Sequence, residues 1–176
     1  MLLPLPIQRR VAYSRPEMKK PSKLCVHRST SHINGVRPTA AIKKGEEICE
    51  YRGQLMSHDD ADDKYGGEDT GHTFLFILND VWVVDGTLRG NIAKWINHSC
   101  EPNCEAVVEE DEGGNRRKDR IVISALRDIK KGEELTYDYE IEVPHAITRA
   151  EKKLWTCRCG FETCTGSMIR PAAQAA

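Results

Sequence analysis

Three cysteines near the C-terminus have the type and spacing of metal ligands. Cys157, Cys159 and Cys164 form a C-x-C-x4-C pattern. Thiolates this close in the chain can share one tetrahedral zinc ion, with Zn–S bonds of about 2.3 Å. A structural zinc site needs a fourth ligand, and Cys100 and Cys104, in an otherwise polar segment, are the leading donors. The alternative is a set of free thiols in a flexible tail.

A second group of residues could hold an amine and a polar ligand. Tyr137 and Tyr139 alternate on a predicted strand, so their side chains should point to the same face. Paired phenols can hold an amine by hydrogen bonding without ionising, although both could equally be buried structural tyrosines. Asn97 and His98 open a segment rich in hydrogen-bonding groups, which suits a buried polar ligand. A lone histidine, however, is more often structural than catalytic.

Other catalytic motifs do not compete with this site. The sequence contains neither a G-x-x-x-x-G-K phosphate loop nor a G-x-S-x-G nucleophile elbow. A zinc hydrolase is also excluded on chemical grounds, because a metal held by four cysteines has no open position for water. The residues therefore favour a binding site for a polar ligand next to a structural metal.

The elements that must position these side chains are mainly β. Apolar runs flanked by turn residues predict strands, and two Lys-Lys-Gly-Glu segments predict turns between strands. Two apolar runs about Asn79-Asp80 predict a hairpin. Strands are expected at 24–26, 74–78, 81–84 and 121–126. Short strands are also expected within 40–51 and 129–135, on either side of the Lys-Lys-Gly-Glu turn that each contains. Helix is expected only at 151–155 and 91–96, and an exposed loop at 109–120.

Length and composition are those of one water-soluble domain. The chain has 176 residues, of which 39% are hydrophobic and 30% charged. The apolar start is followed rather than preceded by Arg9 and Arg10, which is the wrong order for a signal peptide. No run approaches the ~20 apolar residues that span a bilayer. We therefore expect an intracellular protein, cytoplasmic or nuclear and chromatin-associated, with no membrane contact. We also expect a monomer.

Charge is unevenly distributed along the chain. A basic N-terminal arm, residues 1–22, is expected to be flexible and could contact nucleic acid weakly. An acidic insert at about 56–72 is either a solvated loop or a surface that attracts basic peptides. The main domain is expected at 23–143, and a cysteine-rich segment that folds around metal at 144–176.

The motifs together resemble those of the SET-domain protein lysine methyltransferases. The resemblance is carried by three segments and by the C-x-C-x4-C pattern, over about residues 24–168. The segments are Gly45–Gly53 (GEEICEYRG), Gly90–Asn103 (GNIAKWINHSCEPN) and Gly132–Tyr139 (GEELTYDY). It implies a β-clip SET fold of small sheets with a pseudoknot, followed by a short zinc-binding post-SET tail.

The resemblance also implies roles for individual residues. Catalytic and lysine-channel roles fall to Tyr139, Tyr137, Tyr51 and Phe76. The S-adenosylmethionine site would be formed by Asn34, Gly35, Val36, Phe74, Asn97, His98, Tyr139 and Met168. Zinc would be bound by Cys100, Cys157, Cys159 and Cys164.

The expected function is transfer of a methyl group from S-adenosylmethionine to a lysine of a basic protein, such as a histone. A phenol at Tyr137 would hold a water that crowds a methylated amine, so the products should stop at mono- or dimethyl-lysine. The loop His32–Pro38 departs from the family's H-G-x-G-V-F-A, with Ile33 in place of its first glycine. The alternative is therefore a noncatalytic SET-like protein-binding module with an impaired donor loop.

Overall fold

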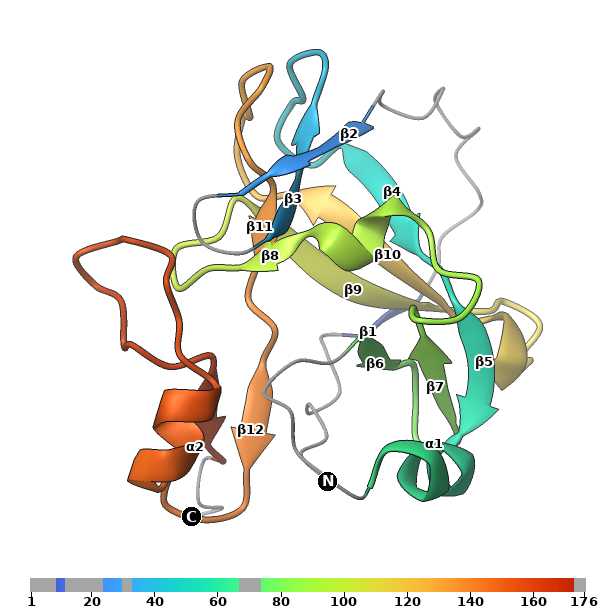
Figure 1. The fold of residues 1–176 in the computed structure, drawn as a ribbon. Coiled ribbons are helices and arrows are strands. Elements are labelled where there is room, and N and C mark those ends of the chain that lie inside the picture. The colour runs from blue at the N-terminus through green and yellow to red at the C-terminus, as the bar shows by residue number, and fades with distance from the viewer. Residues whose placement is uncertain (1–8, 12–23, 30–32, 67–73, 173–176) are drawn as a thin grey trace.

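The fold is mainly β, as predicted, and is built from small sheets (Figure 1). The structure is a computed structural model, and it describes residues 9–11, 24–29, 33–66 and 74–172. None of the helices in this part of the chain is both long and apolar enough to cross a membrane.

The largest sheet has the strand order β1-β9-β10-β4. β4 (Glu47–Tyr51), β9 (Cys104–Glu110) and β10 (Arg120–Ala125) pair antiparallel. β1 (Arg9–Val11) pairs parallel with the outer edge of β9. Part of the arm predicted to be flexible is thus a strand, because β9 offers an edge of unpaired backbone groups that an extended segment can satisfy.

The expected hairpin about Asn79-Asp80 is confirmed. β6 (Leu75–Ile77) and β7 (Trp82–Asp85) pair antiparallel, and β5 (Gln54–Ser57) pairs with the other edge of β7. The Asn79 side chain closes the turn, since its Oδ1 accepts from the backbone N–H groups of Val81 and Trp82.

The acidic insert contains a helix that the sequence analysis missed. α1 (His58–Tyr65) starts at a capping box in which Ser57 and Asp60 each bond the other's backbone N–H. The dense negative charge of this segment masked the capping signal. Two acidic residues assigned to the same insert, Glu68 and Asp69, lie outside the described residues.

Two segments distant in sequence cross at the centre of the molecule. β8 (Asn97–His98) pairs parallel with β11 (Thr136–Tyr137), and the hairpin of β2 (Leu24–Arg28) and β3 (Asn34–Pro38) joins them through a bridge between Val36 and Leu135. The helix expected at 91–96 is the 3₁₀ helix η1 (Ile92–Trp95), and the exposed loop at 109–120 includes a second one, η2 (Arg116–Lys118). This crossing joins the two motifs that carry the candidate site residues.

The C-terminal tail packs as a separate small unit. β12 (Ile141–Val143) pairs parallel with β13 (Ile169–Pro171). α2 (Arg149–Leu154) confirms the helix expected at 151–155, beginning two residues earlier because Thr148 caps it. The tail has its own buried cluster, made of Ile141, Val143, Trp155, Cys157, Met168 and Ile169. This cluster is small, so the tail depends on other contacts for its order.

Candidate functional site

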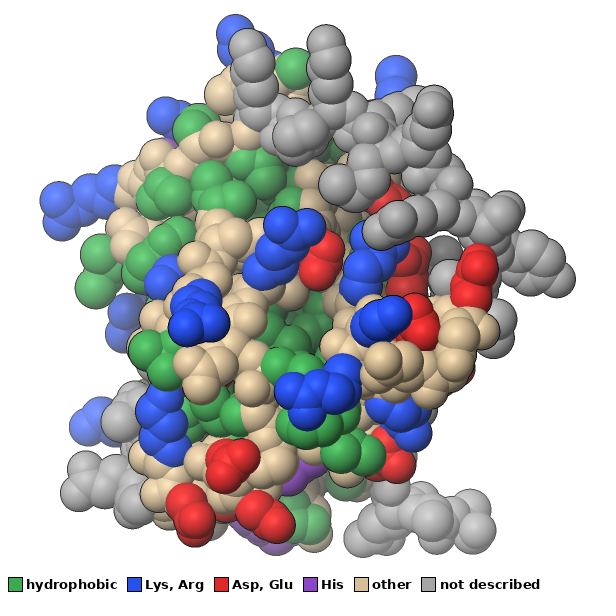
Figure 2. Space-filling view, turned by 90° about the vertical axis from the view of Figure 1, so that its right-hand side faces the viewer, with side chains coloured by type: hydrophobic (Ala, Val, Ile, Leu, Met, Phe, Trp, Pro, Cys, Tyr) green, Lys and Arg blue, Asp and Glu red, His purple; other side chains and the backbone are tan. Residues whose placement is uncertain are grey.

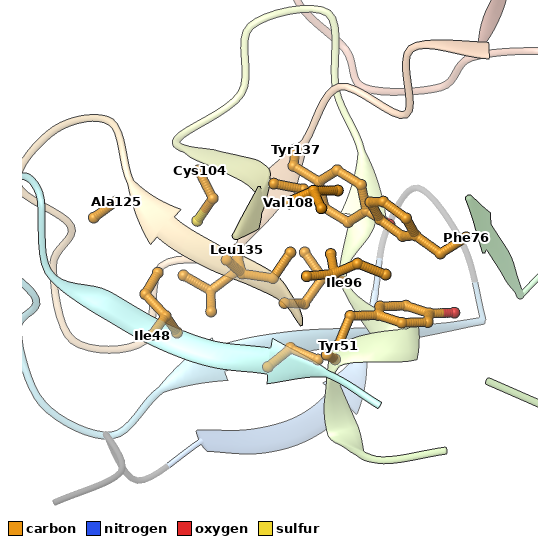
Figure 3. Close-up of a cluster of buried hydrophobic side chains, with 14 of the residues drawn as sticks. Ile48, Tyr51, Phe76, Ile96, Cys104, Val108, Ala125, Leu135 and Tyr137 are labelled. Atoms are coloured by element: carbon orange, nitrogen blue, oxygen red, sulfur yellow. The ribbon is translucent and has the colours of Figure 1, made fainter. Parts of the chain in front are cut away.

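An aromatic cluster forms one end of the main hydrophobic core. The rings of Tyr51, Phe76 and Tyr137 gather there, while Cys104 and Ala125 lie at the opposite end (Figure 3). Ring centroids are 5.1 Å apart for Tyr51 and Phe76 and 6.1 Å apart for Phe76 and Tyr137. β4, β6 and β11 supply these side chains, so three predicted channel residues meet although they are far apart in sequence.

Tyr139 extends this cluster towards the tail. β11 ends at Tyr137, so the two tyrosines do not share a strand, yet their ring centroids are 4.9 Å apart. Tyr139 packs against both the main core and the cluster of the tail. Its hydroxyl donates to the carbonyl of Ile96 at 3.0 Å, and its backbone N–H donates to His98 Nδ1 at 3.2 Å. The phenol is thereby fixed at the junction of the two units.

The phenols of the cluster stay neutral over the physiological range. Burial is the main cause that raises the pKa of Tyr51, Tyr137 and Tyr139 above the ordinary value of about 10. Tyr51 donates its hydroxyl to the carbonyl of Phe74 at 2.7 Å. The hydroxyl of Tyr137 has no hydrogen-bond partner among the described residues. These groups can therefore orient an amine through neutral dipoles, without acting as anions.

The donor residues expected on β3 and β8 lie close together. Asn97 Nδ2 donates to the carbonyl of Asn34 and to Glu134 Oε1, both at 2.8 Å. Gly35 packs so closely that an added Cβ would lie 2.6 Å from Glu134 Oε1. Val36 is 0% exposed, so its side chain belongs to the core and only its backbone could face a ligand.

Two other predicted donor residues are placed differently from each other. Met168 is buried in the tail cluster that Tyr139 touches. Phe74 instead lies beside the aromatic cluster, because its carbonyl accepts from Tyr51. Its ring makes an edge contact with Trp95 at 5.2 Å between centroids, and the Lys94 ammonium lies 5.4 Å from its centroid. Phe74 thus contacts Tyr51, Trp95 and Lys94, and its role at the donor stays a prediction.

The loop that departs from the family pattern is not strained at Ile33. Among the described non-glycine residues, only Arg89 and Glu140 have a positive φ. Ile33 is 83% exposed, so its side chain crowds nothing in the core. The backbone freedom of glycine is therefore not needed at this position.

Four cysteines converge at the junction between the tail and the main domain. Ligand atoms of Cys100, Cys157, Cys159 and Cys164 all lie within 4.8 Å of one another. The sulfur of Cys100 is 3.8 Å from those of Cys157 and Cys164. A tetrahedron with Zn–S bonds of about 2.3 Å has edges of about 3.8 Å, so the arrangement fits zinc.

The structure decides between the two cysteines that the spacing left open. Cys104 is 0% exposed in the main core, where burial raises the pKa of its thiol to about 12. Within the cluster, burial raises the pKa of the Cys157 thiol, whereas backbone N–H groups and the neighbouring thiols outweigh burial at Cys159 and lower its pKa to about 6. The lowered pKa favours the Cys159 thiolate, the form that binds metal. Cys100 therefore completes the cluster, and Cys104 is a core residue.

Residues to which the sequence analysis gave no role also support the site. Glu134 accepts hydrogen bonds from Ser29 and from Asn97. Asp138 lies 3.6 Å from His98 Nδ1 and accepts from the backbone N–H of Glu140. Both carboxylates lie in the Gly-Glu-Glu-Leu-Thr-Tyr-Asp-Tyr segment, but nothing in their spacing indicated partners 37 and 40 residues away.

Comparison with known proteins is consistent with this arrangement. The SET domain family profile matches residues 34–140. Human "Histone-lysine N-methyltransferase 2B" is 40% identical over 152 residues, which cover 84% of this chain and 5% of the relative. The Schizosaccharomyces pombe "Histone-lysine N-methyltransferase, H3 lysine-4 specific" is 40% identical over 141 residues, which cover 78% of this chain and 14% of the relative. The Plasmodium falciparum "Putative histone-lysine N-methyltransferase 1" is 36% identical over 148 residues, which cover 83% of this chain and 2% of the relative. The chain thus spans a small fraction of each relative's length.

Proposed function

Because this chain belongs to the SET domain family, we propose that it transfers methyl groups from S-adenosylmethionine to lysine side chains of a Lys/Arg-rich protein, a histone or histone-like protein. Relatives whose names describe histone-lysine methyltransferases support the proposal. The observation that carries it is the position of Tyr139. Its hydroxyl is held on the carbonyl of Ile96, the neighbour in the chain of Asn97, which bonds the Asn34 carbonyl and suits a polar donor. Its ring contacts Tyr137 of the aromatic cluster, which suits a lysine chain.

The residues present can hold such a donor. Asn97 and His98 are buried polar groups placed beside the backbone of β3. S-adenosylmethionine would supply an electrophilic methyl group on a positively charged sulfonium. The closely packed β3 backbone and the wall formed by Met168 would exclude water from it. We propose that Asn34, Gly35, the Val36 backbone, Asn97, His98, Tyr139 and Met168 form this side of the site.

The chemistry requires alignment more than acid–base catalysis. The lone pair of a neutral lysine amine would form the new N–C bond while the methyl–sulfur bond breaks and leaves its electron pair on sulfur, which departs as a neutral thioether. The methylammonium product would then release its extra proton to water. The rings of Tyr51, Phe76 and Tyr137 would confine the alkyl chain of the lysine to one line of approach. The Tyr139 hydroxyl and the Ile96 carbonyl would orient the reacting groups through their dipoles. The tyrosines need not ionise, in keeping with their raised pKa values.

The degree of methylation is proposed to stop at the mono- or dimethyl product. The Tyr137 side chain is buried, and its hydroxyl has no described partner, so it is free to hold a water beside the amine. That water would occupy the space that a further methyl group needs.

The acidic helix α1 is proposed to attract the basic substrate. Asp59, Asp60, Asp62 and Asp63 are all exposed on it. Acidic side chains gather at the lower edge of the face in Figure 2, at the height of α1 in Figure 1. Such a field raises the local concentration of Lys/Arg-rich peptides at low ionic strength.

Donor binding separates this proposal from a noncatalytic SET-like module. Isothermal titration of the full chain with S-adenosylmethionine should show one site per chain. Replacing Asn97 with Ala should weaken binding about 10-fold or more, since it removes a buried hydrogen-bonding group. The matched control is Asn115→Ala, which alters an exposed asparagine of the η2 turn. No binding by the unaltered chain would favour the noncatalytic module.

A further inference from the structure

We propose that Arg170, in the C-terminal tail, is a positioning residue that holds the backbone around Tyr139 through Asp138. Its effect on methyl transfer rests on the proposed function, whereas its effect on the backbone does not. The sequence analysis gave Arg170 no role. It comes from β13, beyond the cysteine cluster, and reaches the segment that follows β11.

The parallel pairing of β12 and β13 brings Arg170 to this place. Arg170 is in register with Glu142, and its Nε donates to Glu142 Oε1 at 3.0 Å. Its Nη1 donates to Asp138 Oδ2, also at 3.0 Å. One guanidinium therefore joins two carboxylates that are four residues apart. A planar fork with several donors is suited to this, whereas a single ammonium is not.

The two oxygens of Asp138 face different partners. Oδ2 accepts from Arg170, while Oδ1 accepts from the backbone N–H of Glu140 at 2.9 Å and lies 3.6 Å from His98 Nδ1. The same His98 nitrogen accepts from the backbone N–H of Tyr139. By fixing Oδ2, Arg170 also fixes the Asp138 carboxylate whose Oδ1 holds the peptide N–H of Glu140. That peptide unit begins at Tyr139, so Arg170 restrains the backbone of the residue that carries the site's phenol.

The backbone here needs such a restraint. Glu140 has φ of 50°, in the left-handed region that non-glycine residues seldom adopt. Burial, and then repulsion from the carboxylates of Asp138 and Glu142, raise the pKa of Glu140. Among the described residues, Arg170 is the only Lys or Arg side chain that pairs with any of them. Its positive charge offsets this repulsion.

Docking of the tail does not depend on Arg170 alone. Cys100 joins the tail to the main domain at the cysteine cluster, and Tyr139 packs against the apolar cluster of the tail. Removing the guanidinium should therefore leave the tail folded and the metal in place. A change in the catalytic segment would then be a positioning effect and not loss of the tail.

The test compares Arg170→Gln with Arg170→Lys, Glu142→Gln and Arg149→Gln in the full zinc-loaded chain. Arg149 is an exposed tail arginine whose side chain makes no hydrogen bond or ion pair to a described residue, so it controls for the lost charge. Hydrogen exchange at the Tyr139 and Glu140 amides is measured first, without donor or peptide. Arg170→Gln should speed exchange at both amides about 10-fold, and Arg149→Gln should not.

Kinetics and zinc content complete the test. Arg170→Gln should lower kcat about 3- to 10-fold, as expected for loss of one half-exposed charge-assisted hydrogen bond, with KM for a basic peptide and zinc content unchanged. Arg170→Lys should partly rescue kcat, and Glu142→Gln, which leaves the Asp138 contact, should change it less than 2-fold. Unchanged exchange at the Tyr139 and Glu140 amides in Arg170→Gln would overturn the proposal. An equal loss of kcat in Arg170→Gln and Glu142→Gln would also overturn it. An inactive parent chain with faster exchange in Arg170→Gln would instead sink only the proposed methyl transfer.

Discussion

Replacing Cys100 with Ala should release the zinc and loosen the tail. Cys100 supplies one corner of the cluster, with sulfur distances of 3.8 Å to two other thiols. Structural zinc contributes about 10–16 kcal/mol to small metal-folded peptides. Loss of groups that merely orient ligands weakens metal binding about 10- to 100-fold, so loss of a direct ligand should weaken it at least ~100-fold. That is about 2.7 kcal/mol or more.

The matched control is Cys104→Ala, four positions along the same segment. Cys104 lies in the main core, so its loss should cost some stability but leave zinc binding intact. Zinc is measured by competition with a chromophoric chelator. Trp155, which is 4% exposed in the tail cluster, reports tail order through its fluorescence. Equal zinc affinity in Cys100→Ala and the parent chain, or zinc loss in Cys104→Ala, would refute the assignment.

Three further predictions concern the proposed reaction. Tyr137→Phe should shift products towards trimethyl-lysine by mass spectrometry, and an unchanged methylation ceiling would count against the water argument. Changing Asp59, Asp62 and Asp63 together to Asn should raise KM for a basic peptide about 3- to 10-fold at low salt and little at high salt, because the Debye length falls from about 30 Å at 0.01 M to about 3 Å at 1 M. Asp60 is spared because it caps α1, and Glu112→Gln on the exposed 111–114 turn is the single-charge control. Equal effects on KM at both salt concentrations would remove the electrostatic argument. Activity should rise with pH as the lysine amine loses its proton and should not fall up to about pH 10, since the buried phenols have pKa values raised above that; a fall between pH 8 and 10 would contradict the neutral-phenol mechanism.

The sequence was informative where local patterns determine structure. The hairpin of β6 and β7, helix α2 and the three-cysteine motif were all predictable, because turn chemistry and close spacing are local. Helix α1 was missed because its capping box lay within a run of acidic residues that resembles a solvated loop.

Long-range contacts could not be predicted from the residues alone. Spacing left Cys100 and Cys104 equivalent, and only the path of the chain after β8 separates them. The partners of Glu134 and Asp138 depend on the crossing of β8 and β11, which no local pattern shows. The hydrogen bond from Tyr51 to the Phe74 carbonyl joins residues 23 positions apart, and no local pattern shows it.

The most direct test of the account is transfer of labelled methyl groups from S-adenosylmethionine to a histone-type basic peptide, with Tyr139→Phe as the comparison. The parent chain should place label on lysine. Tyr139→Phe should lower kcat about 100-fold or more, as for removal of one preorganised donor. Absence of labelled lysine across a panel of basic peptides, from a zinc-loaded chain that binds the donor, would contradict the proposed reaction.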